Sequence, residues 1–198
     1  MQEIILASVS KRRSQILSSC GIRHIVVPSN IKEVFDKDKS VAEIVEKNAV
    51  MKTEAVAKGS GAAIIIGADT LVMHEGVVMG KPEGEKEAKD MLEKFSGSGI
   101  EVYTGMCVMD VESGRRSLGV DRSEILVPPM DKSEIQGYFY LLGPHDKAGG
   151  FSIEGVGSMI FDNIKGSYFN ILGLSMMKLK VLFAEAGLNI LDFVDKNN

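Results

Sequence analysis

The chain has 198 residues, enough for one substantial hydrophobic core, and 44% of them are hydrophobic, as in ordinary globular proteins. Its 23 lysine and arginine residues against 27 aspartate and glutamate residues give a formal net charge of −4. This sign argues against a protein that binds nucleic acid over a broad surface, so we expect no nucleic-acid partner and only local anion sites.

The cysteines and the N-terminal segment indicate the compartment. Cys20 and Cys107 lie far apart in apolar contexts, with neither CxxC spacing nor a disulfide-dense pattern, so we expect both to be reduced. No basic leader or cleavage site precedes the first apolar run, and the apolar stretch 62–68 is too short to span a bilayer. We expect a cytoplasmic protein with no membrane role.

The pattern of residues 3–29 predicts a strand, a helix and a second strand. Residues 3–8 form a short apolar run typical of a buried strand. Ser10 is a good N-cap for a helix that Gly21 closes, and residues 23–29 predict the next strand.

A longer helix is predicted from Ser40, which forms a capping box with Glu43, to about Lys58. At about 100° per residue, Asn48 and Lys52 fall on its otherwise apolar inward stripe. A lysine in that place either extends its ammonium to solvent or points into a cleft.

The middle of the chain predicts two hairpins. Residues 62–69 form a buried strand, which we expect to end at Asp69 and to lead into a hairpin that turns at 74–76. A surface helix follows Pro82, and residues 100–127 predict two further strands.

A helix capped at Asp131, the glycine-rich loop 146–157 and a final helix closed near Gly187 complete the chain. Strands and helices alternate, but hairpins occur too. The sequence therefore predicts an α/β fold with a mixed sheet flanked by helices, in one domain over residues 1–198.

The stretch ILASVSKRR places Lys11, Arg12 and Arg13 at the start of a predicted helix, where cations are disfavoured. A bound anion would reverse this penalty, because free helix N–H groups and guanidinium groups both bind phosphate oxygens. A nucleotide polyphosphate fits this demand. The alternative is three solvated cations that merely follow a helix cap.

Other charged residues also have two interpretations. Asp69 follows a rigid apolar strand, as a catalytic carboxylate would, but Asp-Thr is also an ordinary turn opener. Taken alone, Lys81 is an exposed loop lysine and Glu33 belongs to a solvated charged stretch. The loop 146–157 has neither P-loop nor dinucleotide-binding spacing, and the histidines and cysteines show no metal-ligand spacing.

Seven segments together resemble the Maf family of nucleoside triphosphate pyrophosphatases. They are LASVSKRRSQIL (6–17), VPSNIKE (27–33), AVMKTEAVA (49–57), GADTLV with GVVMGKP (67–82), VYTG (102–105), DKAGGFSIEG (146–155) and IKGSYFNILGL (164–174). They occur in the family's order over nearly the whole chain, with Lys11 in place of the usual proline.

The resemblance implies an activity and a setting. Members hydrolyse a nucleoside triphosphate to the monophosphate and pyrophosphate with a divalent metal, Mg²⁺ or Mn²⁺. Their elongated α/β fold is similar to that of inosine triphosphatase, with a deep nucleotide-binding cleft between two lobes, and it often forms a homodimer. We therefore expect an enzyme that removes non-canonical nucleotides from the pool of nucleotide precursors.

The resemblance also implies residue roles. Asp69 matches the catalytic aspartate that accepts a proton from the attacking water, and Glu33 matches a second carboxylate of the catalytic and metal site. The positions that match phosphate contacts are Ser8, Arg12, Arg13, Lys52 and Lys81.

Thr70 and Glu154 occupy the positions that affect base choice. ADT (68–70) is typical of UTP and dTTP pyrophosphatases, whereas IEG (153–155) has the glutamate of the 7-methyl-GTP subgroup in place of glutamine. An ionised glutamate only accepts hydrogen bonds, so it favours bases with amino groups, unless it faces solvent or is protonated.

We expect a pyrimidine triphosphate as substrate, with tolerance for amino-bearing or modified bases. The alternatives are a 7-methyl-GTP pyrophosphatase, a phosphoryl- or nucleotidyl-transferring enzyme with the same triphosphate-binding residues, and a non-catalytic nucleotide-sensing regulator of cell division.

Overall fold

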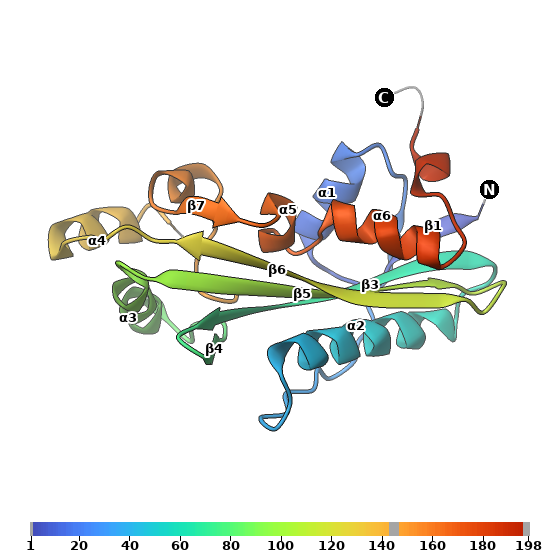
Figure 1. Cartoon of the computed structure of the whole chain (residues 1–198), viewed down its shortest axis with the longest axis horizontal. Helices are drawn as coiled ribbons and strands as arrows, with labels where there is room; N and C mark the ends of the chain where they lie inside the picture. The colour runs from blue at the N-terminus through green and yellow to red at the C-terminus, as the bar shows by residue number, and fades with distance from the viewer. Residues whose placement is uncertain (1, 143–146, 196–198) are drawn as a thin grey trace. The chain divides into compact units, whose positions relative to one another are not determined.

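The computed structural model describes residues 2–142 and 147–195. The described strands form a seven-stranded sheet in the order β2 (Ile25–Val26), β1 (Glu3–Leu6), β3 (Ala63–His74), β5 (Gly99–Asp110), β6 (Arg116–Leu126) and β7 (Asp162–Lys165), with β4 (Val77–Met79) paired to β3. β1 runs parallel to β2 and β3, whereas the pairs β3–β4 and β6–β7 are antiparallel. Helices flank the strands (Figure 1), so the predicted mixed α/β fold class is confirmed.

Residue contacts divide the chain into two compact units. The first unit comprises Met1–Asp69, Thr104–Asp121 and Leu172–Asn198, and the second comprises Thr70–Tyr103 and Arg122–Ile171. β3, β5 and β6 contribute residues to both units.

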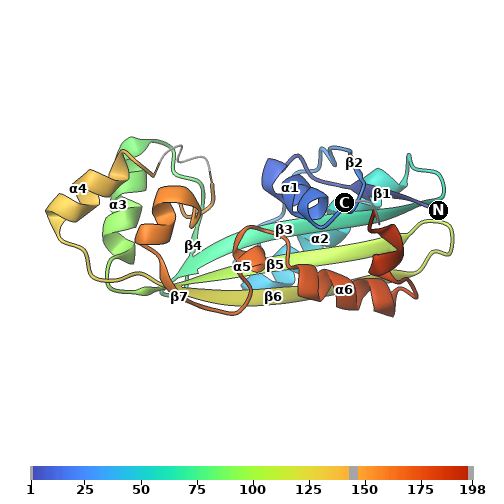
Figure 2. The ribbon, with the colours of Figure 1, turned by 90° about the horizontal axis from the view of Figure 1, so that it is seen from above.

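In the first unit, α2 lies on one face of the strands and α1 and α6 lie on the other (Figures 1 and 2). Its elements are β1 (Glu3–Leu6), α1 (Lys11–Ser19), β2 (Ile25–Val26), α2 (Val41–Ala57), α6 (Met176–Glu185), the 3-10 helix η2 (Ile190–Phe193) and parts of β3 (Ala63–His74), β5 (Gly99–Asp110) and β6 (Arg116–Leu126). The buried Ile64, Ile65 and Ile66 of β3 belong to its core.

Helix caps of the first unit form as their sequences predict. The Ser10 hydroxyl accepts a hydrogen bond from the Arg13 N–H at the start of α1, and Gly21 follows α1 with a φ of 70°. At the start of α2, Ser40 and Glu43 make both hydrogen bonds of the capping box.

In the second unit, α3 packs against α4, as Figure 2 shows. The elements that lie wholly in this unit are β4 (Val77–Met79), α3 (Glu85–Phe95), α4 (Lys132–Phe139), η1 (Gly155–Met159), β7 (Asp162–Lys165) and α5 (Tyr168–Ile171). α3 buries Ala88, Met91, Leu92 and Phe95, the residues at helical spacing in this segment.

The prediction that a strand ends at Asp69 is wrong. β3 continues without interruption to His74, and the turn that follows contains Glu75 and Gly76, both with positive φ. The strand tolerates an aspartate in its middle because the carboxylate has buried partners on α2, described below. The prediction also missed β7, and residue 146 of the predicted glycine-rich loop lies outside the described residues.

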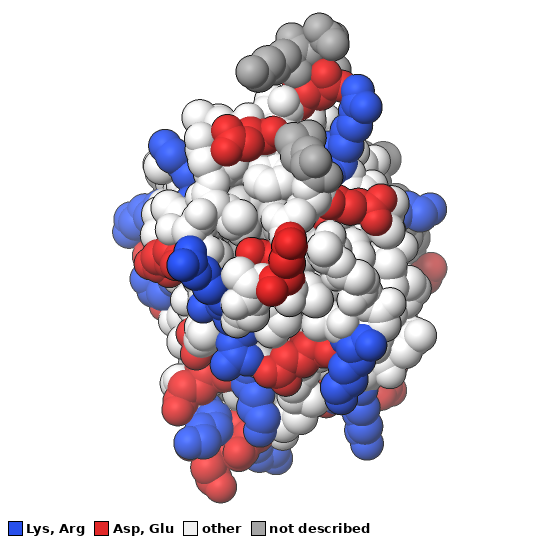
Figure 3. Space-filling view, turned by 90° about the vertical axis from the view of Figure 1, so that its right-hand side faces the viewer, with Lys and Arg blue, Asp and Glu red and all other residues white. Residues whose placement is uncertain are grey.

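On the face shown in Figure 3, acidic and basic side chains are interspersed, which agrees with the nearly balanced composition. Among the described residues, no helix combines the length and the apolar character that a membrane crossing requires.

Two glycines allow α2 to approach the sheet closely. A Cβ at Gly67 would lie 2.1 Å from Thr53 Oγ1, and a Cβ at Gly105 would lie 2.3 Å from the Val45 carbonyl oxygen. A Cβ at Gly67 would also lie 2.4 Å from the Ala49 carbonyl oxygen. Backbone cannot move away as a flexible side chain can, so both positions require glycine.

We therefore expect Gly105→Ala to lower the free energy of unfolding by about 3 kcal/mol, because α2 must shift away from β5. Gly59→Ala is the matched control, since a Cβ there would meet no atom within 4 Å. Urea unfolding of both variants measures the difference, and equal stability would contradict the close approach.

Candidate active site

The candidate residues fall in both units. Ser8, Arg12, Arg13, Glu33, Lys52 and Asp69 belong to the first unit, and Thr70, Lys81 and Glu154 belong to the second. In the first unit, Ser8 follows β1, and Arg12 and Arg13 lie in the first turn of α1. Glu33 lies in a loop, Lys52 on a face of α2, and Asp69 inside β3.

Lys52 connects the two candidate carboxylates. It is 7% exposed, and its Nζ lies 2.7 Å from Glu33 Oε1 and 2.7 Å from Asp69 Oδ1. Nζ also donates to the Ala68 carbonyl oxygen at 3.3 Å. The inward position of Lys52 on α2 was predicted, and the structure shows that the ammonium is buried among oxygen atoms.

Asp69 has a donor on each carboxylate oxygen. Lys52 contacts Oδ1, and Asn48 Nδ2 donates to Oδ2 at 2.9 Å. Asp69 is only 4% exposed, so these donors replace lost hydration and hold the carboxylate in one orientation. Asn48 was not among the candidate site residues. Its place on the inward stripe of α2 was the signal that could have identified it.

Arg13 is buried rather than solvated. Its Nε donates to the Gly173 carbonyl at 2.8 Å, and its Nη1 donates to Ser8 Oγ at 3.0 Å and to the Ala68 carbonyl at 2.9 Å. Burial lowers the pKa of the guanidinium, and the negative charges of Asp69 and Glu33 oppose this shift. Solvation as a bare surface cation is therefore excluded for Arg13.

The neighbouring residues complete the start of α1. Ser8 Oγ accepts hydrogen bonds from Arg13 and from the Ser10 N–H, the latter at 3.2 Å. Lys11 is exposed and Arg12 is half-buried. The cationic helix start thus places one guanidinium inside the unit and leaves Lys11 at its surface.

Glu33 and Asp69 supply part of the ligand set that a Mg²⁺ ion needs. Among the described residues, no group of three or more His, Cys, Asp or Glu side chains could hold a metal ion. Glu33 and Asp69 are nevertheless joined through one lysine, and Mg²⁺ is usually held by one or two carboxylates together with substrate phosphates. The described residues thus supply two carboxylates, and a metal held there would need its remaining ligands from a phosphorylated substrate and water.

The candidates of the second unit have different surroundings. Thr70 is half-buried and continues β3 directly after Asp69, and Lys81 is exposed beyond β4. Glu154 is exposed at the start of η1, and its carboxylate accepts from Ser152 Oγ at 3.4 Å. Burial, followed by the negative charge of Glu154, raises the pKa of Tyr168.

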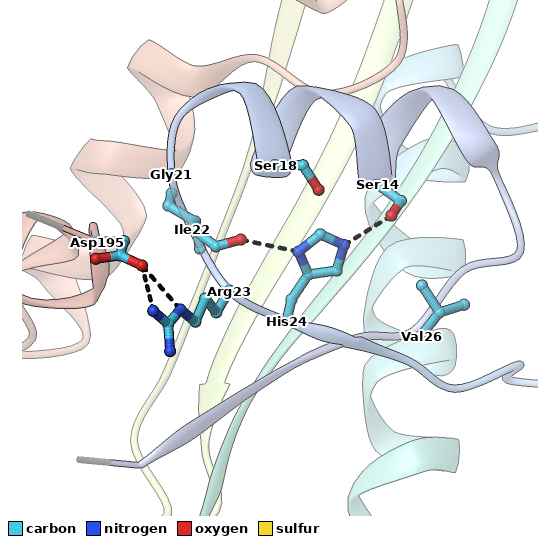
Figure 4. Close-up of a pocket in the computed structure, with 8 residues that line it drawn as sticks. All are labelled: Ser14, Ser18, Gly21, Ile22, Arg23, His24, Val26 and Asp195. Carbon is cyan, nitrogen blue, oxygen red and sulfur yellow. Dashed lines mark hydrogen bonds and ion pairs between the residues drawn. The ribbon is translucent and has the colours of Figure 1, made fainter. Parts of the chain in front are cut away.

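Figure 4 shows a pocket of about 390 Å³ in the first unit. The Ser14 hydroxyl lies 2.8 Å from His24 Nε2, and His24 Nδ1 lies 3.0 Å from the Ile22 carbonyl oxygen. Arg23 pairs with Asp195 at the edge of this pocket. None of the candidate residues lines it.

We expect Lys52→Met to lower the free energy of unfolding by about 3 kcal/mol, because the buried Asp69 carboxylate loses its cation. Lys39→Met is the matched control, since the ion pair of Lys39 with Glu43 at the start of α2 is exposed and contributes little. Urea unfolding at neutral pH measures both variants, and a Lys52→Met protein as stable as wild type would exclude a buried ion pair.

Two relatives and a family model match nearly the whole chain. The dTTP/UTP pyrophosphatase of Dictyoglomus thermophilum is 39% identical over 191 residues, covering 96% of this chain and 99% of that protein. That of Caldicellulosiruptor bescii is 37% identical over 195 residues, covering 96% and 98%. The Staphylococcus aureus Ham1 structure matches with a TM-score of 0.42 and 15% identity over 64% of this chain and 72% of that chain. The family described as Maf-like protein matches residues 3–186, and the chain therefore belongs to the Maf-like protein family.

Proposed function

We propose that this protein hydrolyses a nucleoside triphosphate between its α- and β-phosphates, releasing the monophosphate and pyrophosphate. The observation that carries the proposal is the buried Lys52, which joins Asp69 and Glu33 in a member of the Maf-like family. The names of the relatives, dTTP/UTP pyrophosphatases, support a pyrimidine triphosphate as substrate over 7-methyl-GTP.

Asp69 is proposed as the base. Each of its oxygens carries one donor and keeps a second lone pair, so the carboxylate can accept a proton from the attacking water while it stays oriented. The water oxygen then bonds to phosphorus, the anhydride bond breaks, and its bridging oxygen leaves with the pyrophosphate. The result is a monophosphate and pyrophosphate.

Cationic and hydroxyl side chains are proposed to bind the phosphates. Lys52 and Arg12 supply positive charge in the first unit, and Lys81 supplies it in the second. Arg13 and Ser8 are already hydrogen-bonded to each other, so they present a preorganised donor group rather than two mobile side chains.

A divalent cation, Mg²⁺ or Mn²⁺, is proposed as cofactor. Glu33 and Asp69 would hold it together with phosphate oxygens of the substrate. When bound, such an ion offsets the negative charge that develops on the departing pyrophosphate.

We expect Asp69→Asn to reduce turnover by about 1,000-fold, because an amide cannot accept the proton from water. The assay follows pyrophosphate release with Mg²⁺ or Mn²⁺ and identifies both products. Thermal unfolding serves as the folding control, since asparagine keeps the shape of aspartate. Turnover near the wild-type rate would remove Asp69 from the mechanism, and a nucleoside diphosphate product would contradict cleavage between the α- and β-phosphates.

Base choice is proposed to depend on Thr70 and Glu154. A carboxylate accepts hydrogen bonds, so it pairs with an amino group such as that of cytosine, whereas a glutamine amide also complements the carbonyl groups of uracil and thymine.

We expect Glu154→Gln to shift the ratio of kcat/KM values for UTP over CTP upward by about tenfold, the effect of one hydrogen bond regained. A substrate panel of UTP, dTTP, CTP, 7-methyl-GTP and modified pyrimidine triphosphates measures the change. Glu93→Gln, at an exposed position of α3, is the matched control. Selectivity for UTP and dTTP that is identical in wild type and Glu154→Gln would exclude a discriminating role for Glu154.

A further inference from the structure

Asn48 is a buried polar residue that takes no part in the chemistry proposed above. It is 2% exposed and lies one helical turn before Lys52 on the inward face of α2. A buried amide without partners is costly, and an apolar residue would suit this stripe better. An amide whose oxygen and nitrogen both form hydrogen bonds at this buried position therefore indicates a specific structural or functional role.

The amide holds the backbone beside Glu33. Asn48 Oδ1 accepts a hydrogen bond from the Val34 N–H at 2.8 Å, and Nδ2 donates to the Val34 carbonyl at 3.1 Å. Residues 28–35 are all described and form neither helix nor strand. These two hydrogen bonds therefore anchor the segment to α2 at the residue that follows Glu33.

The same amide holds Asp69. Nδ2 also donates to Asp69 Oδ2 at 2.9 Å, while Lys52 Nζ contacts Oδ1 at 2.7 Å. Asn48 and Lys52 project from one rigid helix, and together they define the plane of the carboxylate. Glu33, whose side chain is 58% exposed, relies on Lys52 and on the anchored backbone next to it.

We propose that Asn48 is a positioning residue for the reaction, which through one amide fixes the Asp69 carboxylate and the Glu33 segment in a single arrangement. This proposal rests on the proposed function, because the arrangement of the carboxylates matters for catalysis only if they act on the triphosphate. A displacement of reacting groups by an ångström can cost about 100-fold in rate. The residues proposed to bind phosphate are separate from Asn48, so substrate binding should largely survive its loss.

Asn48→Leu tests this directly, because leucine has nearly the shape of asparagine and removes all three hydrogen bonds. Asn48→Ser is the second variant, since its short side chain leaves room for water should leucine impair folding. Thr53→Val is the matched control. Thr53 is a fully buried polar residue of α2 whose hydroxyl donates to the Ala49 carbonyl at 2.9 Å, without contact to either carboxylate.

Two measurements are made on each folded variant. We expect kcat to fall by about 100-fold while KM changes by less than about threefold, the signature of lost alignment rather than lost binding. Hydrogen–deuterium exchange of the Val34 amide should accelerate by about tenfold, because its acceptor is gone. Thr53→Val should match wild type in both measurements.

The outcomes separate this proposal from the proposed function. Wild-type exchange at Val34 in the Asn48 variants, unchanged kcat, or a loss confined to KM would each overturn the positioning role while the enzyme activity stands. A wild-type protein that hydrolyses no nucleoside triphosphate would overturn both the proposed function and the catalytic role of Asn48.

Discussion

A lysine ammonium enclosed between two carboxylates organises the candidate site. Asp69 lies inside a strand of the sheet, where an ionised group without partners would be strongly destabilising. Lys52 supplies the opposite charge from α2, and it also reaches Glu33 on a segment that has no regular structure. Three separate segments of the chain are thus held together by one cation, and the sheet can carry a carboxylate where a hydrophobic side chain would otherwise lie.

The charges around this ammonium are close to balance. Lys52 and Arg13 are cations, Asp69 and Glu33 are anions, and Arg13 directs its described hydrogen bonds to neutral oxygens. A triphosphate that approaches such a site brings more negative charge than these four groups can neutralise. In the proposed function, Arg12 would offset part of it, and the proposed divalent cation would offset more. The charge balance of these four residues is therefore consistent with the proposed use of a divalent cation.

Local signals predicted the helices well and the long-range contacts poorly. Capping residues such as Ser10 and Ser40 define helix starts by themselves, and the inward stripe of α2 was visible in the spacing that places Lys52 on it. The hydrogen bond from Arg13 to the Gly173 carbonyl could not be predicted, because Gly173 lies 160 residues away in the sequence. The continuation of β3 past Asp69 was missed for a similar reason. An aspartate usually opens a turn, and only tertiary partners make it acceptable within a strand.

The two carboxylates differ in how firmly they are held, and this difference matches their proposed roles. Asp69 belongs to β3, which lies between β1 and β5 in the sheet, and donors fix both of its oxygens. A general base benefits from such rigidity, because its lone pair must meet a water proton at a defined angle. Glu33 has a mostly exposed side chain on an irregular segment. As a proposed metal ligand, its carboxylate would have more freedom than that of Asp69 to orient toward a Mg²⁺ ion. The proposed roles therefore combine a base whose carboxylate is fixed in the sheet with a second carboxylate whose backbone is anchored at Val34 and whose side chain is mostly exposed.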